Sequence, residues 1–347
     1  MSFDLKACLQ PTRLAYGYAS PEHWCWCGSA IRGDDGRYHM FSARWPKKYP
    51  FFSGYVVSSE IVHAVSDTPY GPYAFREVVL GDRGEEFWDG RMTHNPSIIK
   101  CGDTYVLFYI GATYSGPRPT VEELYGETKD TRIDACYATI RIGAATAKSL
   151  DGPWTRLDAP IFERDPDGWD RTVVTNPAPC ICRDGSILLY YRSNTPEGLR
   201  IGVARAKDAS LNFERIIDHP ILLEHPELRV EDPFVWEADD GFHMIAKDMK
   251  GTTGEVFGGV HLVSPDGIAW EYAEPMQAYS RTIRLMEDDG SIREETAYHL
   301  ERPNLTFEDG KPIFMTAAYG ADGGDVQPFG GKFDVMRESR TLVIPLV

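Results

Sequence analysis

Apolar and polar residues alternate in short segments along most of this chain, and turn residues separate the segments. After Asp35-Gly36, for example, residues 38–42 alternate with the period of a β-strand, and Asp-Gly supplies the positive φ angles of a two-residue hairpin turn. One phrase recurs five times: two polar residues, usually a proline, a few apolar residues, a Gly/Asp turn and an aromatic-rich strand. The copies begin at Trp26-Cys27-Gly28, His94-Asn95-Pro96, Thr175-Asn176-Pro177, Glu231-Asp232-Pro233 and Glu301-Arg302-Pro303.

A second phrase follows four of these hairpins and adds two strands to each. It consists of a third strand, a turn containing Gly or Asn, and an aromatic residue that opens a fourth strand, at residues 60–73, 141–154, 200–213 and 259–270. Four strands per unit and five units predict an all-β fold, a five-bladed β-propeller with four antiparallel strands per blade. The alternative, a β-sandwich with coincidental turn spacing, does not explain two aligned phrases.

The repeat fills most of the 347 residues, and no stretch reads as a linker. We therefore expect a single propeller domain over residues 1–347, with blades that start near residues 24, 94, 175, 231 and 301. The spacing between copies is uneven. The longest insertion covers about residues 114–137 and contains a short helical pattern at 121–125; such loops often wall a pocket on one face of a propeller.

Charge and cysteine content narrow the classes of function. A net charge of −16 argues against nucleic-acid binding, which needs a basic surface. The N-terminus lacks the plan of a signal peptide and no run of about 18 apolar residues occurs, so we expect a cytoplasmic protein without a membrane span. The seven cysteines, including the pairs Cys25/Cys27 and Cys180/Cys182, have no zinc-site spacing and are best explained as buried reduced thiols, with a metal site as the alternative.

The polar residues of the recurring phrase meet where the blades meet. The first strand of each blade lines the central channel, so the two residues before each proline lie near one another: His94/Asn95, Thr175/Asn176, Glu231/Asp232 and Glu301/Arg302. Because strand side chains alternate, only one residue of each pair faces inward unless a β-bulge presents both.

A longer similar segment precedes two of the copies. The segment from Trp88-Asp89 to Pro96 parallels the segment from Trp169-Asp170 to Pro177. Asp89 and Asp170 therefore occupy equivalent places just before an inner strand, which predicts a position at the mouth of the channel. Ordering of the entry loop is the alternative role for both.

Several carboxylates around a polar funnel are what glycoside hydrolysis requires, since one acid protonates the leaving oxygen and one carboxylate activates water or attacks the sugar. Arg302 and Arg44 are candidates to lower a carboxylate's pKa or to bind an anionic group, and Trp26 is a candidate surface for sugar stacking. His94, Asn95, Asn176, Asp232 and Glu301 complete the candidate substrate-binding set. Structural hydrogen bonding is the alternative for His94, Asn95 and Asn176. An unpaired charge is costly when it is buried among apolar residues. Glu231 stands at a strand start among such residues, which favours a functional role for it.

At these residues the chain resembles the five-bladed β-propeller glycoside hydrolases, particularly glycoside hydrolase family 43 and its relatives. Residues 230–236, Val-Glu-Asp-Pro-Phe-Val-Trp, are similar to the family's general-acid motif, in which a glutamate stands two residues before a proline. The resemblance implies that Glu231 is the general acid. The family's Asp-Pro phrases for the base and the orienting aspartate are replaced here by Cys27-Gly28, Asn95-Pro96 and Asn176-Pro177. The base is therefore not carried over; Asp170 and Asp89 are candidates by position alone, and Asp232 is a further candidate.

The resemblance implies a glycosidase that cleaves a terminal sugar of the pentose or furanose type, with a carbohydrate as its partner and no required cofactor. It also allows a divalent cation bound in the channel. Two other functions stay open at this point. One is a glycoside phosphorylase, for which Arg302, Arg91, Arg171 and Arg192 offer cations; the other is a non-catalytic carbohydrate-binding propeller.

Overall fold

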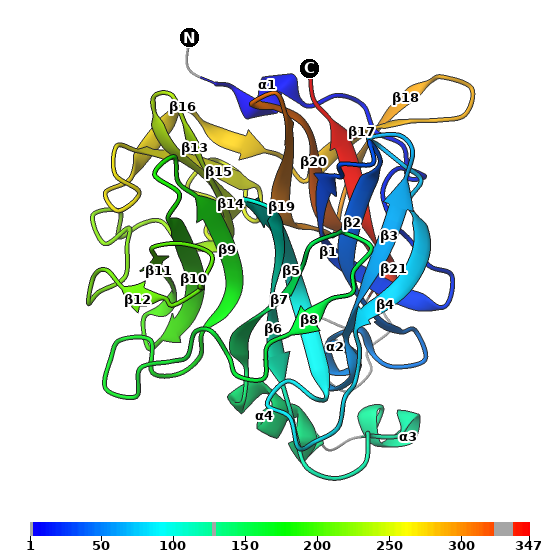
Figure 1. The fold of residues 1–347 in the computed structure, drawn as a ribbon. Helices are drawn as coiled ribbons and strands as arrows, with labels where there is room; N and C mark the ends of the chain where they lie inside the picture. Colours follow the sequence, from blue (N-terminus) through cyan, green and yellow to red (C-terminus); the bar gives the residue numbers. More distant parts are fainter. Residues whose placement is uncertain (1–2, 127–129, 323–335) are drawn as a thin grey trace.

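The computed structural model describes residues 3–126, 130–322 and 336–347, and its strands form five antiparallel blades around a central axis (Figure 1). The predicted five-bladed propeller is therefore confirmed. In each of the first four blades, four strands are hydrogen-bonded in chain order, with the first strand innermost. These blades contain β1 (His23–Arg32), β2 (Tyr38–Pro46), β3 (Glu60–Ser66) and β4 (Ala74–Leu80); β5 (Met92–Cys101), β6 (Thr104–Ala112), β7 (Arg141–Ala147) and β8 (Thr155–Arg156); β9 (Thr175–Ile181), β10 (Ile187–Thr195), β11 (Gly198–Ala206) and β12 (Glu214–Arg215); and β13 (Val230–Ala238), β14 (Gly241–Asp248), β15 (Gly259–Ser264) and β16 (Glu271–Tyr279).

The fifth blade combines both ends of the chain. Its three sequential strands are β19 (His299–Glu308), β20 (Lys311–Asp322) and β21 (Met336–Pro345). The N-terminal segment takes the outer position, because Tyr18 and Thr341 exchange backbone hydrogen bonds of 2.9 and 3.0 Å and Leu9 bridges to Leu346. The hairpin of β17 (Thr282–Met286) and β18 (Ile292–Thr296) links the fourth blade to the fifth. The pairing of the N-terminal segment with β21 joins the two ends of the chain and closes the ring.

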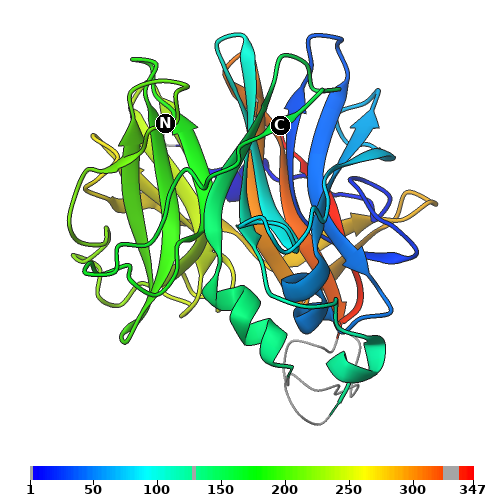
Figure 2. The same cartoon turned by 60° about the horizontal axis from the view of Figure 1, so that its bottom comes forward.

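The helices mark the two ends of the propeller. The helix α1 (Leu5–Cys8) lies at the end that carries the termini (Figure 1). The helices α2 (Phe51–Ser58), α3 (Val121–Leu124) and α4 (Thr131–Ala138) lie in the β2–β3 and β6–β7 connections at the opposite end, which Figure 2 brings forward. The predicted helix within the 114–137 insertion is confirmed as α3. Each inner strand begins at this second end, which we call the helical face.

Turn chemistry explains how the hairpins form. Gly36 and Gly185 adopt φ values of 82° and 84°, which a side chain would oppose. The preceding aspartates fix the turns, since Asp35 and Asp184 accept backbone N–H bonds of 3.0 and 2.9 Å from residues two positions later. These local interactions set the register of the first two strands of each blade.

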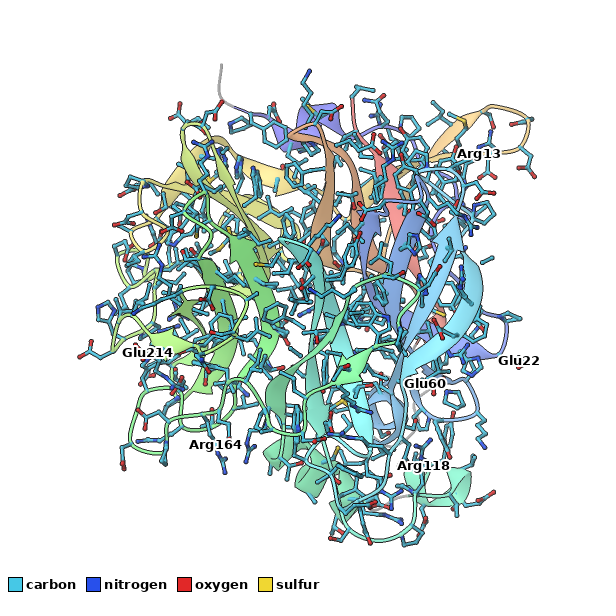
Figure 3. The ribbon with its side chains drawn as sticks, in the orientation of Figure 1. Arg13, Glu22, Glu60, Arg118, Arg164 and Glu214 are labelled. Carbon is cyan, nitrogen blue, oxygen red and sulfur yellow. The ribbon has the colours of Figure 1, made fainter. Side chains whose placement is uncertain are left out.

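Packing between blades supplies the core, while charged side chains such as Arg164 and Glu214 cover the outside (Figure 3). Trp88 and Trp169 belong to the core, since each stacks on a buried tyrosine, Tyr109 and Tyr191, with ring centroids 6.0 Å apart. All seven cysteines are free. Within the described residues, no helix has both the length and the apolar composition needed to cross a bilayer.

Candidate active site

Every inner strand is bulged at the recurring phrase. The strand register shifts there in all five blades, and one residue per blade adopts a left-handed conformation, with φ between 40° and 57°. A bulge can turn two consecutive side chains toward the axis, so these bulges fit the arrangement in which both residues of a pair are presented. The five left-handed residues are Cys27, Asn95, Asn176, Asp232 and Arg302.

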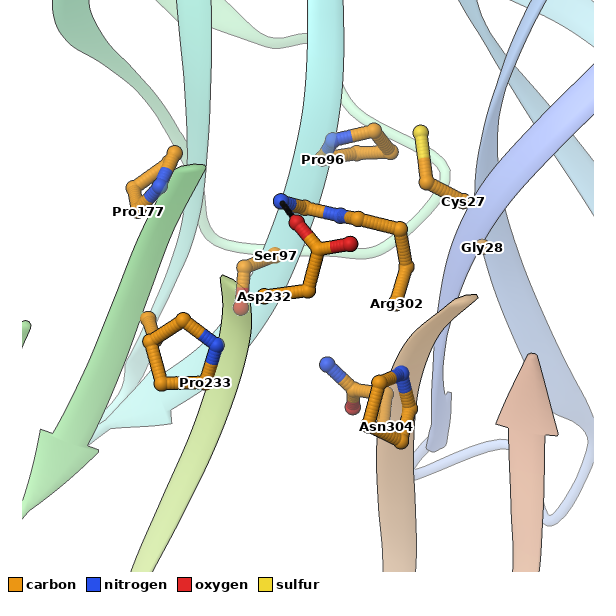
Figure 4. A pocket seen from close by; sticks show the side chains of 11 residues that line it. Cys27, Gly28, Pro96, Ser97, Pro177, Asp232, Pro233, Arg302 and Asn304 are labelled. Carbon is orange, nitrogen blue, oxygen red and sulfur yellow. Dashed lines mark hydrogen bonds and ion pairs between the residues drawn. The ribbon is translucent and has the colours of Figure 1, made fainter. Parts of the chain in front are cut away.

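These five residues, which we call the axial ring, are joined across the blades by hydrogen bonds. The Cys27 thiol donates to Asn95 Oδ1 at 3.3 Å, Asn95 Nδ2 donates to Asn176 Oδ1 at 2.9 Å, and Asn176 Nδ2 donates to Asp232 Oδ1 at 2.6 Å. Arg302 donates to the same carboxylate oxygen at 2.8 Å (Figure 4). Burial raises the pKa of the Cys27 thiol to about 12, which keeps its proton available for donation.

The axial ring has little free space around it. The cavity lined by Cys27, Asp232, Arg302 and the neighbouring prolines measures about 10 Å³, roughly the space of one water molecule (Figure 4). Asp232 is the one carboxylate of the axial ring, and Arg302 already neutralises it. This arrangement opposes a further cation, and the channel-bound divalent cation that the resemblance allows stays a prediction.

The residues one position earlier form a second layer on the helical-face side of the ring, which we call the mouth layer. It consists of Trp26, His94, Thr175, Glu231 and Glu301. Two of the five are carboxylates on neighbouring blades, with side chains 19% and 15% exposed for Glu231 and Glu301. The mouth layer is therefore where the channel offers reactive groups to solvent.

Two cations from second strands hold these glutamates. Arg192 on β10 donates to Glu231 Oε1 at 2.9 Å. Lys247 on β14 lies 3.8 Å from Glu231 Oε2 and donates to Glu301 Oε1. The His299 Nδ1 is 2.6 Å from the same Glu301 oxygen. Each cation thus reaches the glutamate of the next blade, and a single ammonium group joins the two carboxylates.

The surroundings push the pKa values of the two glutamates apart. Burial, together with the neighbouring negative charge of Asp232, raises the pKa of Glu231 despite the opposing effect of Arg192 and Lys247. Burial also acts to raise the pKa of Glu301, but the positive charge of Lys247 and the contact with His299 outweigh it and lower the pKa. Burial works to lower the pKa of Lys247, and the charges of both glutamates reverse this and raise it. At neutral pH the site therefore favours a proton on Glu231 over one on Glu301.

Aromatic side chains wall the mouth layer. Trp26 packs edge-on against Phe51 of α2 and His299, with ring centroids 4.9 and 5.9 Å away. His94 stacks on Tyr55 at 4.7 Å and contacts Ser59 Oγ at 2.8 Å. Burial and the charge of Arg302 lower the pKa of His94 to about 3, so this imidazole stays neutral and is a poor proton donor.

The structure places Asp89 and Asp170 away from the axial ring and the mouth layer. Both are completely buried. Asp89 is held by Arg83 at 2.6 Å, Arg156 at 2.7 Å and Tyr109 Oη at 2.7 Å. Asp170 accepts from Arg215 at 2.7 Å and Tyr191 Oη at 2.8 Å. Buried carboxylates that are saturated by donors of their own blade cannot meet a sugar. The structure therefore contradicts the expected catalytic role of Asp89 and Asp170.

Of the other candidates, most lie at the channel and the rest are paired elsewhere. His94, Asn95, Asn176, Asp232, Glu301, Arg302 and Trp26 all lie in the mouth layer or the axial ring, together with Glu231. Arg44 does not, because it pairs with Glu60 at 2.8 Å on the neighbouring strand and lies over the ring of Phe75. Arg91 is likewise paired with Asp82, at 3.3 Å.

Sequence reasoning missed Lys247 and His299 as members of the site. The signal for Lys247 is a charged residue at the end of the apolar run Met244-Ile245-Ala246 in a second strand. Arg192 likewise follows Tyr190-Tyr191 in β10 and pairs with Thr175. A cation in an otherwise buried second strand requires a counter-charge, and the adjacent inner strand is the place to seek it.

The five-bladed propeller fold of this chain is similar to that of solved glycoside hydrolases. A family 117 glycoside hydrolase from Zobellia galactanivorans matches with a TM-score of 0.67 and 16% identity over 99% of this chain and 91% of its own. A thermostable family 43 glycoside hydrolase matches with a TM-score of 0.60 and 13% identity over 94% and 91%.

A Bombyx mori family 32 β-fructofuranosidase matches with a TM-score of 0.58 and 15% identity, over 98% of this chain and 64% of its own. No protein-family model and no curated protein matches the sequence. At these identities the likeness concerns the fold.

Proposed function

We propose that this protein is a glycoside hydrolase whose reaction takes place in the mouth layer, with Glu231 as general acid and Glu301 as the ionised partner. The observation that carries the proposal is the pair of neighbouring glutamates that share one lysine and have oppositely shifted pKa values. Two carboxyl groups whose surroundings separate their pKa values are the usual basis of acid and base roles. The fold shared with several glycoside hydrolases supports the same class.

In this proposal Glu231 gives its proton to the leaving glycosidic oxygen. Glu301 either activates water or attacks the anomeric carbon, and the separation of the two carboxyl groups in the complex decides between these mechanisms. Lys247 keeps Glu301 ionised, and Arg192 orients Glu231. Asp232 contributes the negative charge that favours the protonated form of Glu231, while Arg302 fixes Asp232 in the axial ring.

A terminal pentose or furanose-type sugar is the substrate class that we favour. The axial ring closes the channel just behind the glutamates, which suits a pocket for the end of a chain rather than a groove for its middle. Solved structures of similar fold include a fructan 1-exohydrolase from Cichorium intybus and an endo-arabinase from Bacteroides thetaiotaomicron. Arabinosides, xylosides and fructosides are therefore the first compounds to test.

The test is a panel of p-nitrophenyl arabinofuranosides and xylosides together with sucrose, arabinan and fructan. Glu231→Gln should lower kcat/KM by about 10²- to 10⁴-fold on a substrate with a poor leaving group, and much less on a p-nitrophenyl glycoside, which needs no proton. Glu301→Gln should reduce hydrolysis of both substrates. The matched control is Glu237→Gln on the same strand, because Glu237 accepts from the backbone N–H of Arg183 at 2.7 Å, far from the mouth layer.

Full activity of Glu231→Gln on both substrates would remove the acid assignment. The phosphorylase alternative is less well supported, because Arg192, Lys247 and Arg302 are each paired with a carboxylate. Turnover that requires inorganic phosphate would favour it over hydrolysis. The non-catalytic alternative predicts sugar binding without turnover of any compound in the panel.

A further inference from the structure

Phe257 is a strained and exposed aromatic residue beside the mouth layer. It lies in the loop of residues 249–258 that joins β14 to β15 at the helical face. Its φ is 67°, a conformation that a bulky side chain rarely adopts, and 38% of the residue is exposed. Its ring lies over Lys247, with Nζ 4.9 Å from the ring centroid, and over Arg281 at 5.9 Å.

Burial compensates for this conformation less than it does at comparable residues. Two other bulky residues with positive φ, Leu211 and Leu222, are only 4% and 9% exposed, so burial of their side chains offsets the strain. Phe257 keeps 38% of its surface exposed, so burial offsets less of its strain. A strained aromatic residue that stays partly exposed indicates a local role, and strain of this kind concentrates at ligand sites.

The loop is built to hold Phe257 in place. Asp248 is completely buried, and its carboxylate accepts backbone N–H bonds from Lys250, Gly251 and Thr253 at 2.8 to 3.0 Å. The N–H of Phe257 then donates to the Asp248 carbonyl at 2.7 Å. Because Asp248 directly follows Lys247 on β14, the same short segment positions both the shared ammonium group and the exposed ring.

We infer that Phe257 is a sugar-stacking platform that determines substrate affinity at the mouth layer, an inference that rests on the proposed function. Its ring lies against Lys247, whose ammonium group contacts both glutamates, and 38% of the residue is exposed as apolar surface. The C–H face of a sugar ring packs on such a surface while its hydroxyl groups reach the charged residues.

The test combines Phe257→Asn with Phe257→Tyr. Asn tolerates the left-handed conformation but has no ring, so the melting temperature should stay the same or rise while KM for the glycoside hydrolysed by the wild type increases about tenfold or more. Phe257→Tyr should keep KM within about twofold of wild type. Val256→Asn is the matched control, because Val256 is the adjacent exposed apolar residue, at 46% exposure.

An unchanged KM in Phe257→Asn overturns the inference, as does an equal rise in Val256→Asn. A raised KM that comes with a shifted pH profile also overturns it, because the effect would then pass through Lys247. Saturation-transfer NMR with D-xylose, L-arabinose and D-fructose separates this inference from the function on which it rests. If the wild type binds a sugar but hydrolyses none of the compounds, and Phe257→Asn abolishes that binding, the platform is supported and the hydrolase is refuted. If the wild type is active and Phe257→Asn binds the sugar as well as the wild type does, the hydrolase is supported and the platform is refuted.

Discussion

Carboxylates paired with arginine or lysine occur in two regions of this propeller, and the regions are built differently. Asp89 and Asp170 lie within the second and third blades, where every nearby donor comes from the same blade or its entry loop and neither side chain is accessible. Glu231 and Glu301 lie between blades, share Lys247, and keep part of their surface exposed. Burial and a cationic partner are therefore common to both regions. The two glutamates of the proposed reaction differ in that their partners come from across a blade boundary and leave part of their surface exposed.

The largest effect that should separate the two regions is on stability. Asp170→Asn leaves Arg215 and Tyr191 without the carboxylate that joins them, so we expect a loss of about 3–5 kcal/mol in the free energy of unfolding. The value of kcat per folded molecule should not change. Urea unfolding and active-fraction assays measure both quantities, and exposed Asp167→Asn is the control. Lost activity at unchanged stability would return Asp170 to the candidate site.

The recurring phrase was sufficient to predict the fold, because turn chemistry and strand alternation are local properties. It also predicted that the residues before the prolines meet at the axis. It could not show which carboxylates are saturated within their own blade and which stay partly exposed at the channel mouth. Asp170 is followed by an arginine in sequence, yet its partner is Arg215 of β12, and only the packed blade brings the two together.

The bulge explains why Lys247 was missed. Counted outward from the turn pair Ala238 and Gly241, the regular register would place Lys247 opposite Asp232. The bulge shifts the register by one residue and places Lys247 opposite Glu231 instead. A change of one position in pairing is set by the left-handed conformation of Asp232, which is not a property of the local pattern.

A smaller effect should follow from removal of the shared ammonium group. Lys247→Met takes away a charge that lowers the pKa of both glutamates, so both pKa values rise. In the proposed mechanism Glu301 must be ionised, so the acid limb of the kcat/KM profile should move to higher pH, with about a 10- to 100-fold loss at the wild-type optimum. The exposed Lys250→Met is the control. A uniform loss at every pH would indicate that Lys247 acts only through packing.

The smallest effect concerns His63, a buried imidazole 3.6 Å from Glu77 Oε1, which sharpens the contrast with both carboxylate regions. Burial, and next the neighbouring His39, lower the pKa of His63 to about 3, so the folded protein holds this imidazole neutral. The unfolded chain binds a proton below about pH 6.5, and the folded protein does not until about pH 3. The stability contributed by His63 is therefore complete above that upper value and is lost as the pH falls, by about 1.4 kcal/mol per pH unit.

Urea unfolding between pH 4.5 and 6.5 tests this, in a window above the range where most carboxylates titrate, at about pH 4. His63→Asn lowers stability at every pH through lost contacts, but it should also reduce the slope of unfolding free energy against pH by about one proton. The exposed His219→Asn should leave the slope unchanged.

Glu231 affects the slope in the opposite direction, because its raised pKa makes the folded state bind the extra proton. Glu231→Gln should therefore steepen the slope that His63→Asn makes shallower, so the two variants report separately on a buried neutral group and on a carboxyl group that retains its proton. An unchanged slope in His63→Asn would show that His63 is charged in the folded protein, with Asp35 or Glu77 as its counter-charge.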